Sequence, residues 1–152
     1  MDIFKELHSE AIRLDIAAEK KEDMFGVLVE ALCVTEQVDR ALPALEEVLR
    51  RETVLSTGVG NGVALPHARL ENFKGFALAF GRPQQPLDVD AVDGQPADLF
   101  FMLLADKNDP GTIVKILGRL ARLCDDASVR TGLRKADNPA AIIKVFKNAE
   151  SS

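Results

Sequence analysis

Residues 99–105 read Leu-Phe-Phe-Met-Leu-Leu-Ala, an unbroken apolar run with the length of a strand. Side chains of a strand point alternately to the two faces of its sheet, so this strand would be apolar on both faces. Such a strand belongs in the centre of a sheet that helices cover on both sides. The run therefore predicts an α/β fold with a buried central strand.

The remaining strand signals are weaker. Residues 76–80 form a short apolar run, residues 53–57 read as a strand that leads into a glycine-rich segment, and residues 87–92 alternate weakly. Residues 11–17 also alternate, which predicts a short strand with three aliphatic side chains on one face: Ile12, Leu14 and Ile16.

Helical spacing of apolar residues recurs on both sides of these strands. The repeating positions are 24, 27, 28, 31 and 32 in a first helix, 41, 45, 48 and 49 in a second, and 113, 116, 117, 120, 121, 129, 133, 142, 143, 145 and 146 in three later pieces. The second helix should carry Pro43 in its first turn and end at residues 50–52, and Asp137-Asn138-Pro139 should start the last helix.

This order of helices, strands and helices, with no repeat or long linker, predicts an α/β sandwich: a mixed β-sheet flanked by helices on both faces. A length of 152 residues and an apolar fraction of 47% suit a single domain over residues 1–152. Only the end, Ser151-Ser152, is expected to fray.

Composition disfavours several kinds of partner. The net charge of −5 opposes general electrostatic binding to nucleic acid or to an anionic membrane. No signal-like start and no stretch of about 18 apolar residues occur, so we expect a cytoplasmic protein without membrane insertion. Among the charged side chains, acidic ones predominate in residues 1–49 and basic ones in residues 112–147. This distribution indicates either solvated helix surface or a docking face. Cys33 and Cys124 have apolar neighbours and are expected to be buried thiols.

The segment most specific for chemistry is residues 51–69, Arg-Glu-Thr-Val-Leu-Ser-Thr-Gly-Val-Gly-Asn-Gly-Val-Ala-Leu-Pro-His-Ala-Arg. Its glycines alternate at positions 58, 60 and 62, and glycine permits the positive φ that lets backbone N–H groups converge on an anion. A tight turn without a ligand is the plain alternative. Pro66 restricts the backbone directly before His67 and helps to aim the imidazole.

A neutral imidazole has a lone pair that can attack phosphorus, and a usual pKa of about 6.5 keeps much of it neutral near pH 7. Phosphoryl transfer asks the protein mainly to position groups and to balance charge. Arg51 and Arg69 are candidates for donating guanidinium hydrogen bonds, although surface charge is the plainer reading of Arg69. We therefore predict His67 as phosphoryl acceptor, Arg51 as the group that stabilises the phosphoryl group, and the following phosphate-binding set: Thr57, Gly58, Gly60, Asn61, Gly62 and Arg69.

The other histidine, His8, falls in an acidic amphipathic stretch that reads as a solvated helix, and it receives no role. Two histidines and two cysteines far apart in the sequence do not supply the ligands of a metal hydrolase. Neither a metal nor a cofactor is expected.

Residues 51–52 and 56–67 closely resemble the phosphorylation motif of the fructose- and mannitol-type enzyme IIA domains of the bacterial phosphotransferase system. This type-2 family includes the nitrogen-regulatory enzyme IIA proteins. Residues 95–99, Gln-Pro-Ala-Asp-Leu, and residues 116–121, Ile-Leu-Gly-Arg-Leu-Ala, resemble two further family motifs. The resemblance therefore covers nearly the whole chain.

The resemblance implies the enzyme IIA fold and a phosphotransferase component that works through a phosphohistidine intermediate. By resemblance, His67 would accept phosphate on Nε2 from the histidine-containing phosphocarrier protein or its nitrogen-branch counterpart, and Arg51 would stabilise the transferred group. Enzyme IIB or regulatory target proteins are the further partners that it implies.

One position departs from the family pattern. Many members have a second histidine at the start of the helix that follows the long apolar strand, and Ile113 stands there in this chain. An aliphatic side chain neither donates to a phosphoryl oxygen nor relays a proton. We expect less efficient onward transfer, which favours nitrogen or metabolic regulation over sugar uptake of the fructose/mannitol type. A non-catalytic regulatory docking module is a further alternative.

Overall fold

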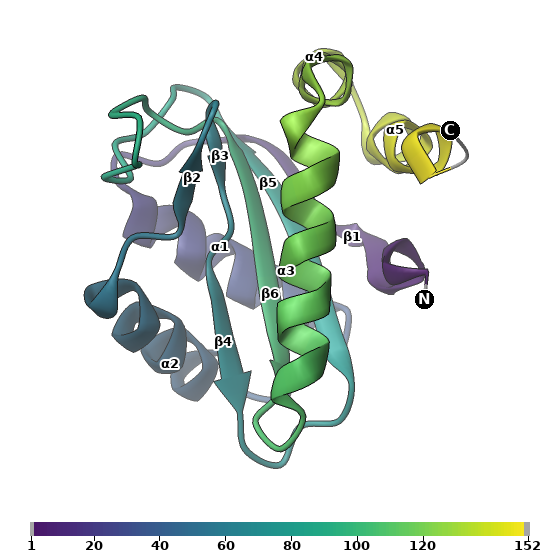
Figure 1. Ribbon diagram of the computed structural model, residues 1–152. Coiled ribbons are helices and arrows are strands. Elements are labelled where there is room, and N and C mark those ends of the chain that lie inside the picture. Colours follow the sequence, from purple (N-terminus) through teal and green to yellow (C-terminus); the bar gives the residue numbers. More distant parts are fainter. Residues whose placement is uncertain (1, 151–152) are drawn as a thin grey trace.

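The computed structural model describes residues 2–150, and the end that was expected to fray, Ser151-Ser152, lies outside them. Its strands form one mixed sheet, with β6 at the centre (Figure 1). The strands are β1 (Leu7–Ile16), β2 (Gly58–Gly60), β3 (Val63–Ala64), β4 (His67–Leu70), β5 (Phe76–Pro83) and β6 (Leu99–Asp106). The central apolar strand predicted at residues 99–105 is confirmed.

The pairing of β6 decides where the other strands lie. β6 pairs antiparallel with β5, and β1 extends the sheet beyond β5 in parallel. Along its other edge, β6 pairs in parallel with β3 and then with β4, and β2 lies antiparallel beyond β3. β6 therefore pairs with two short strands, β3 and then β4, along the same edge.

Helices cover both faces of the sheet, as predicted (Figure 1). They are a 3₁₀ turn η1 (Ile3–Glu6) and the α-helices α1 (Lys21–Val34), α2 (Ala41–Val54), α3 (Pro110–Asp125), α4 (Ala127–Lys135) and α5 (Pro139–Glu150). Asn138 accepts a hydrogen bond from the Ala141 N–H before α5, which confirms the predicted start of that helix. Within residues 2–150, no helix combines the length and the apolar character that crossing a membrane requires.

The side chains of β6 alternate between two cores, one on each face. Phe101 and Leu103 belong to the core shared with α3, α4 and α5, whereas Phe100 and Met102 belong to the core shared with α1 and α2. All four are fully buried. Burial of a side chain of this size contributes about 1.5–3 kcal/mol, so this strand anchors both layers of helices.

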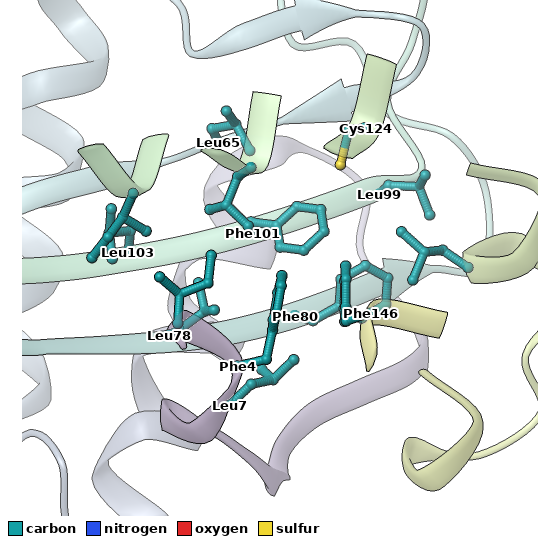
Figure 2. Packing of buried hydrophobic residues seen from close by; sticks show 14 of the residues in the cluster. Phe4, Leu7, Leu65, Leu78, Phe80, Leu99, Phe101, Leu103, Cys124 and Phe146 are labelled. Atoms are coloured by element: carbon teal, nitrogen blue, oxygen red, sulfur yellow. The ribbon is translucent and has the colours of Figure 1, made fainter. Parts of the chain in front are cut away.

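An aromatic cluster joins the two ends of the chain on the α3–α5 side (Figure 2). The rings of Phe4 in η1 and Phe146 in α5 stack with centroids 4.2 Å apart. Phe80 of β5 and Phe101 of β6 meet edge to face at 5.1 Å, and Phe146 contacts Phe101 in the same way at 5.6 Å. These contacts hold η1 and α5 against the centre of the sheet.

The end of α2 differs from the prediction. The helix continues through Val54, so the predicted end at residues 50–52 and the predicted strand at residues 53–57 are wrong. The Thr53 hydroxyl donates to the Arg50 carbonyl within the last turn, and the Val54 side chain is 78% exposed. Strand propensity reflects packing on a half-buried sheet surface, and exposed residues such as Val54 gain nothing from it.

The first strand is also less regular than predicted. Asp15 has a positive φ of 55°, and the register with β5 shifts between Arg13 and Ile16. Ile12 and Leu14 consequently pack in the α3–α5 core, while Ile16 packs in the α1–α2 core. The expectation that these three side chains share one face is wrong for Ile16, because the irregularity reverses the alternation.

Other weak signals resolve differently from expectation. His8 lies exposed in β1, which begins at Leu7, and not in a helix. In the region 87–92 the structure has only an isolated bridge between Leu87 and Ala97. Both cysteines are free thiols, and only Cys124 is fully buried.

Candidate functional site

His67 is the first residue of β4, directly after a break in the strand that runs along β6. β3 pairs with the beginning of β6, and after Leu65 and Pro66 the pairing resumes with His67 opposite Leu103. The Pro66 carbonyl accepts a hydrogen bond from Leu103 N at 3.0 Å, and proline has no N–H to donate in return. Pro66 thus separates the two short strands and sets the point at which His67 enters the sheet.

A backbone hydrogen bond orients the His67 ring. Nδ1 lies 2.8 Å from the carbonyl oxygen of Leu65. Because a carbonyl oxygen only accepts, Nδ1 must carry the proton that is donated. In the neutral ring the lone pair is then on Nε2, which is the nitrogen available for attack on an electrophile.

The surroundings keep this ring neutral. His67 is half-buried, and burial lowers its pKa below the ordinary value of 6.5. The hydrogen bond to Leu65 acts in the opposite direction, and the positive charge of Arg51 lowers the pKa further. The lowered pKa favours the neutral imidazole, protonated only on Nδ1, near pH 7.

His67 lines a cleft of about 490 Å³ between α2, β4 and α3. The charged residues of its wall are Glu47, Arg50, Arg51, Arg69 and Lys107, so cations outnumber carboxylates. The remaining wall is apolar: Val54, Ala68, Pro110, Ile113, Val114 and Leu117. A half-buried surface with this charge suits a phosphoryl group, which is anionic.

The two predicted arginines both lie at this cleft. Arg51 is in the last turn of α2, where its Nη1 donates to the Leu55 carbonyl at 2.8 Å and leaves further N–H groups of the fork for other acceptors. Arg69 follows His67 by two residues in β4, so both side chains leave the strand on the same face. The positive charges of Arg51 and Arg69 both lower the pKa of His67.

Sequence reasoning missed three charged residues of the wall: Glu47, Arg50 and Lys107. A usable signal was present, because residues 47, 50, 51 and 54 follow one helical face at spacings of three and four. Glu47 and Arg50 form an ion pair at 2.6 Å on this face. Lys107 follows the end of β6 and pairs with Glu71, a contact that only the tertiary fold creates.

The glycine turn has the backbone that was predicted for two of its three glycines. Gly60 and Gly62 have φ values of 97° and 82°, and Asn61 between them has a φ of 59°, whereas Gly58 has no positive φ. A side chain at position 62 would bring its Cβ to 2.7 Å from an Asp98 oxygen. Glycine is therefore required at position 62 both by conformation and by space.

This turn faces a different part of the surface from His67. Arg134 of α4 binds the Asp98 carboxylate through Nε and Nη2 at 2.8 and 2.9 Å, and the same Nη2 donates to the Asn61 carbonyl at 2.8 Å. Asn61 and Gly62 line a hollow with this pair of charges. None of the predicted residues from Thr57 to Gly62 is part of the wall of the His67 cleft.

Several backbone amides of the turn are already occupied. The N–H of Thr57 donates to Glu52, that of Gly58 to the Ser56 hydroxyl, and that of Asn61 to Asp93. Such amides are not available to cradle an anion in this conformation. Of the residues predicted for the site, Arg51 and Arg69 line the cleft with His67, whereas the others lie outside its wall: Thr57, Gly58, Gly60, Asn61 and Gly62. β3 separates the turn at residues 60–62 from His67 along the chain.

Ile113 lies in the first turn of α3 and lines the cleft with His67. Its side chain is 5% exposed and contributes to the α3–α5 core. Among residues 2–150, no group of three or more His, Cys, Asp or Glu side chains has an arrangement that would hold a metal ion.

Known proteins resemble this chain over most of its length. The family model described as phosphoenolpyruvate-dependent sugar phosphotransferase system, EIIA 2, matches residues 5–149. The nitrogen regulatory protein of Bradyrhizobium diazoefficiens is 36% identical over 127 residues, which cover 84% of this chain and 82% of that protein. The crystal structure of nitrogen regulatory protein IIA-Ntr from Neisseria meningitidis has a TM-score of 0.88 at 30% identity, covering 95% of this chain and 98% of that one.

The sugar branch is represented as well. The PTS system fructose-specific EIIABC component of Bacillus subtilis is 34% identical over 146 residues, or 96% of this chain. The match spans 23% of that protein, so this chain corresponds to about a quarter of its length. The mixed sheet with helices on both faces is the fold shared with the Neisseria meningitidis protein, which confirms the expected fold class.

Proposed function

The chain belongs to the EIIA 2 family of the phosphoenolpyruvate-dependent sugar phosphotransferase system, and we propose that it carries a phosphoryl group on His67. The observation that supports this assignment most directly is the state of the ring. Nδ1 is fixed by the Leu65 carbonyl, and Nε2 is left as the nucleophile at a cleft with a cationic wall. The donor is the histidine-containing phosphocarrier protein or its nitrogen-branch counterpart.

The chemical step is an exchange of one N–P bond for another. The lone pair of His67 Nε2 attacks phosphorus as the N–P bond to the donor imidazole breaks, and the donor nitrogen keeps the bonding electrons. The proton on Nδ1 stays in its hydrogen bond with Leu65. Arg51 donates to the phosphoryl oxygens, where a preorganised cation balances charge in a loose transition state. Arg69 is a second donor from the same strand face.

We assign the carrier to nitrogen or metabolic regulation. Nitrogen regulatory relatives match over most of their own length and over most of this chain, and they include the protein with the TM-score of 0.88. A fructose-specific EIIA component matches over similar lengths, so the choice of branch rests on the cleft. Sugar uptake through enzyme IIB is the alternative that the fructose-specific relative suggests. Ile113 favours regulation because it supplies the cleft with neither a proton nor a hydrogen bond for onward transfer.

Labelling with isotopic phosphoenolpyruvate, the general phosphotransferase enzyme and a phosphocarrier protein tests the assignment. Acid-labile, base-stable label should appear on the wild type and on His8→Ala, and should be absent from His67→Ala. His8 is a suitable control because it is exposed on β1. Label that persists on His67→Ala would move the acceptor elsewhere, and a wild type without label would leave only a docking role.

The branch is tested by the partners of the labelled protein. A regulatory carrier should be labelled faster by the nitrogen-branch phosphocarrier than by the sugar-branch protein, and should pass little label to an enzyme IIB domain. Rapid transfer to enzyme IIB would instead assign the chain to sugar uptake.

A further inference from the structure

A buried carboxylate lies beside the cleft and has no part in the chemistry described above. Glu52 is in the last turn of α2, directly after Arg51, and is 8% exposed. It belongs to the motif of residues 51–67, but it is not part of the cleft wall. A buried charge is costly unless donors surround it, so its partners indicate what it does.

Three donors from two segments hold this carboxylate. The Thr57 hydroxyl donates to Oε1 at 2.6 Å, and the Thr57 N–H donates to Oε2 at 3.2 Å. The ammonium group of Lys21, the first residue of α1, lies 3.0 Å from Oε2. Lys21 is also 3.9 Å from Asp90, which is largely exposed. Glu52 therefore fastens the end of α2 to the start of α1 and to the residue before β2.

The hydrogen bonds continue from this carboxylate to His67. The carbonyl of Thr57 accepts from the N–H of Leu65 at 2.9 Å. The carbonyl of Leu65 in turn accepts from Nδ1 of His67 at 2.8 Å. Hydrogen bonds thus connect the Glu52 carboxylate to the imidazole through the backbones of Thr57 and Leu65. In each of these residues the N–H and the C=O belong to different peptide groups, so the connection acts by holding the backbone in place.

We propose that Glu52, held by Lys21 and Thr57, is the positioning residue that fixes the orientation and the Nδ1–H tautomer of His67 for phosphoryl transfer. It acts through the backbone and does not touch the phosphoryl group. The same carboxylate also sets the place of Arg51, because the two residues share the last turn of α2. One buried group therefore helps to place both the nucleophile and a cation of the same cleft wall.

The electrostatic role of Glu52 is consistent with this geometry. Its negative charge raises the pKa of His67, while burial, Arg51 and Arg69 lower it. Attack by Nε2 leaves positive charge on the ring, and a nearby carboxylate stabilises that charge. Arg51 alone would stabilise the negative charge on the phosphoryl oxygens but would destabilise the positive charge on the ring. The negative charge of Glu52 offsets this second effect.

The test compares Glu52→Gln with Glu46→Gln in the full chain. Glu46 is an exposed carboxylate on the same helix, so its substitution removes the same charge without touching the hydrogen bonds that connect Glu52 to His67. NMR titration of the unphosphorylated protein should show a lower midpoint for His67 in Glu52→Gln and an unchanged one in Glu46→Gln. Labelling of Glu52→Gln should slow about tenfold, by analogy with the loss seen when the supporting partner of a metal-ligating histidine is removed. A folded Glu52→Gln with the wild-type midpoint would overturn the proposal.

A second pair of variants covers the case in which Glu52→Gln does not fold. Thr57→Val keeps the shape of the side chain and removes the hydroxyl donor, and Thr57→Ser retains it. Ring ¹⁵N shifts should report a smaller Nδ1–H fraction and labelling should slow in Thr57→Val, with recovery in Thr57→Ser. Wild-type shifts and rates in a folded Thr57→Val would equally refute the proposal.

The inference rests on the proposed function, but the two fail separately. The titration and the ring shifts are measured without any phosphate donor, so they report on Glu52 even if the wild type accepts no label. Normal labelling of the wild type together with unchanged His67 properties in both variants would reject Glu52 alone.

Discussion

Substitution of Gly62 by alanine separates a structural role of the glycine turn from a role in phosphate binding. Residue 62 has a φ of 82°, where a side chain costs about 1–2 kcal/mol. The new Cβ would lie 2.7 Å from an oxygen of Asp98 and closer still to Arg134, so their ion pair must shift. That pair is partly exposed, with side-chain exposures of 36% for Arg134 and 26% for Asp98, so its loss costs at most about 1 kcal/mol.

The total predicts that Gly62→Ala lowers the free energy of unfolding by about 1–3 kcal/mol. For a domain of this size, the melting temperature should fall by roughly 2–12 °C. Gly75→Ala is the matched control, because Gly75 has a φ of 73° and a methyl group added there would meet no neighbouring atom within 4 Å. Gly75→Ala should lower the free energy of unfolding only by the conformational cost of about 1–2 kcal/mol.

The assay is thermal unfolding followed by circular dichroism, with labelling of His67 at a temperature at which both variants are folded. Because Gly62 is not part of the His67 cleft, labelling should proceed at the wild-type rate. Equal melting temperatures of the two variants would show that the contact with Asp98 and Arg134 costs nothing. If Gly62→Ala is folded but is labelled at least tenfold more slowly, the glycine turn takes part in the phosphoryl site.

Three further predictions concern the cleft. Arg51→Ala should slow labelling of His67 by about 10²-fold, the typical cost of losing one preorganised donor to a transition state, and unchanged rates would remove Arg51 from the mechanism. The rate of phosphoryl acceptance, measured against pH, should rise as His67 loses its proton and should level off with a midpoint below 6.5, because burial lowers the pKa of this ring; a midpoint above 6.5 would contradict the neutral-ring argument. Ile113→His should speed transfer from labelled protein to an enzyme IIB domain, since it places a second imidazole in the cleft, and an unaltered transfer rate would show that Ile113 does not limit this step.

Periodic patterns in the sequence were sufficient for the helices and for the central strand. The run at residues 99–105 is apolar on both faces because its side chains pack in both cores. A strand that is apolar on both faces belongs in the centre of a sheet. The end of α2 and the irregular strand β1 were not predictable in the same way. Thr53 and Val54 have strand propensity but lie at the exposed end of a helix, and the positive φ of Asp15 leaves no mark in the apolar pattern.

The sequence by itself determined which residue is the nucleophile candidate, because an imidazole behind Pro66 with arginines nearby is a local pattern. Only the tertiary structure decided which neighbours share its cleft. The chain is extended between Gly62 and His67, and at about 3.3 Å per residue this carries the glycine turn roughly 15 Å from the ring. Pairing with β6 brings Lys107 to the cleft instead, and the buried bonds of Glu52 bring Lys21 and Thr57 together across distant segments. Residues that are close in sequence can lie far apart along an extended strand. Sheet pairing and helix packing instead bring residues from distant segments into contact, where they form ion pairs and hydrogen bonds.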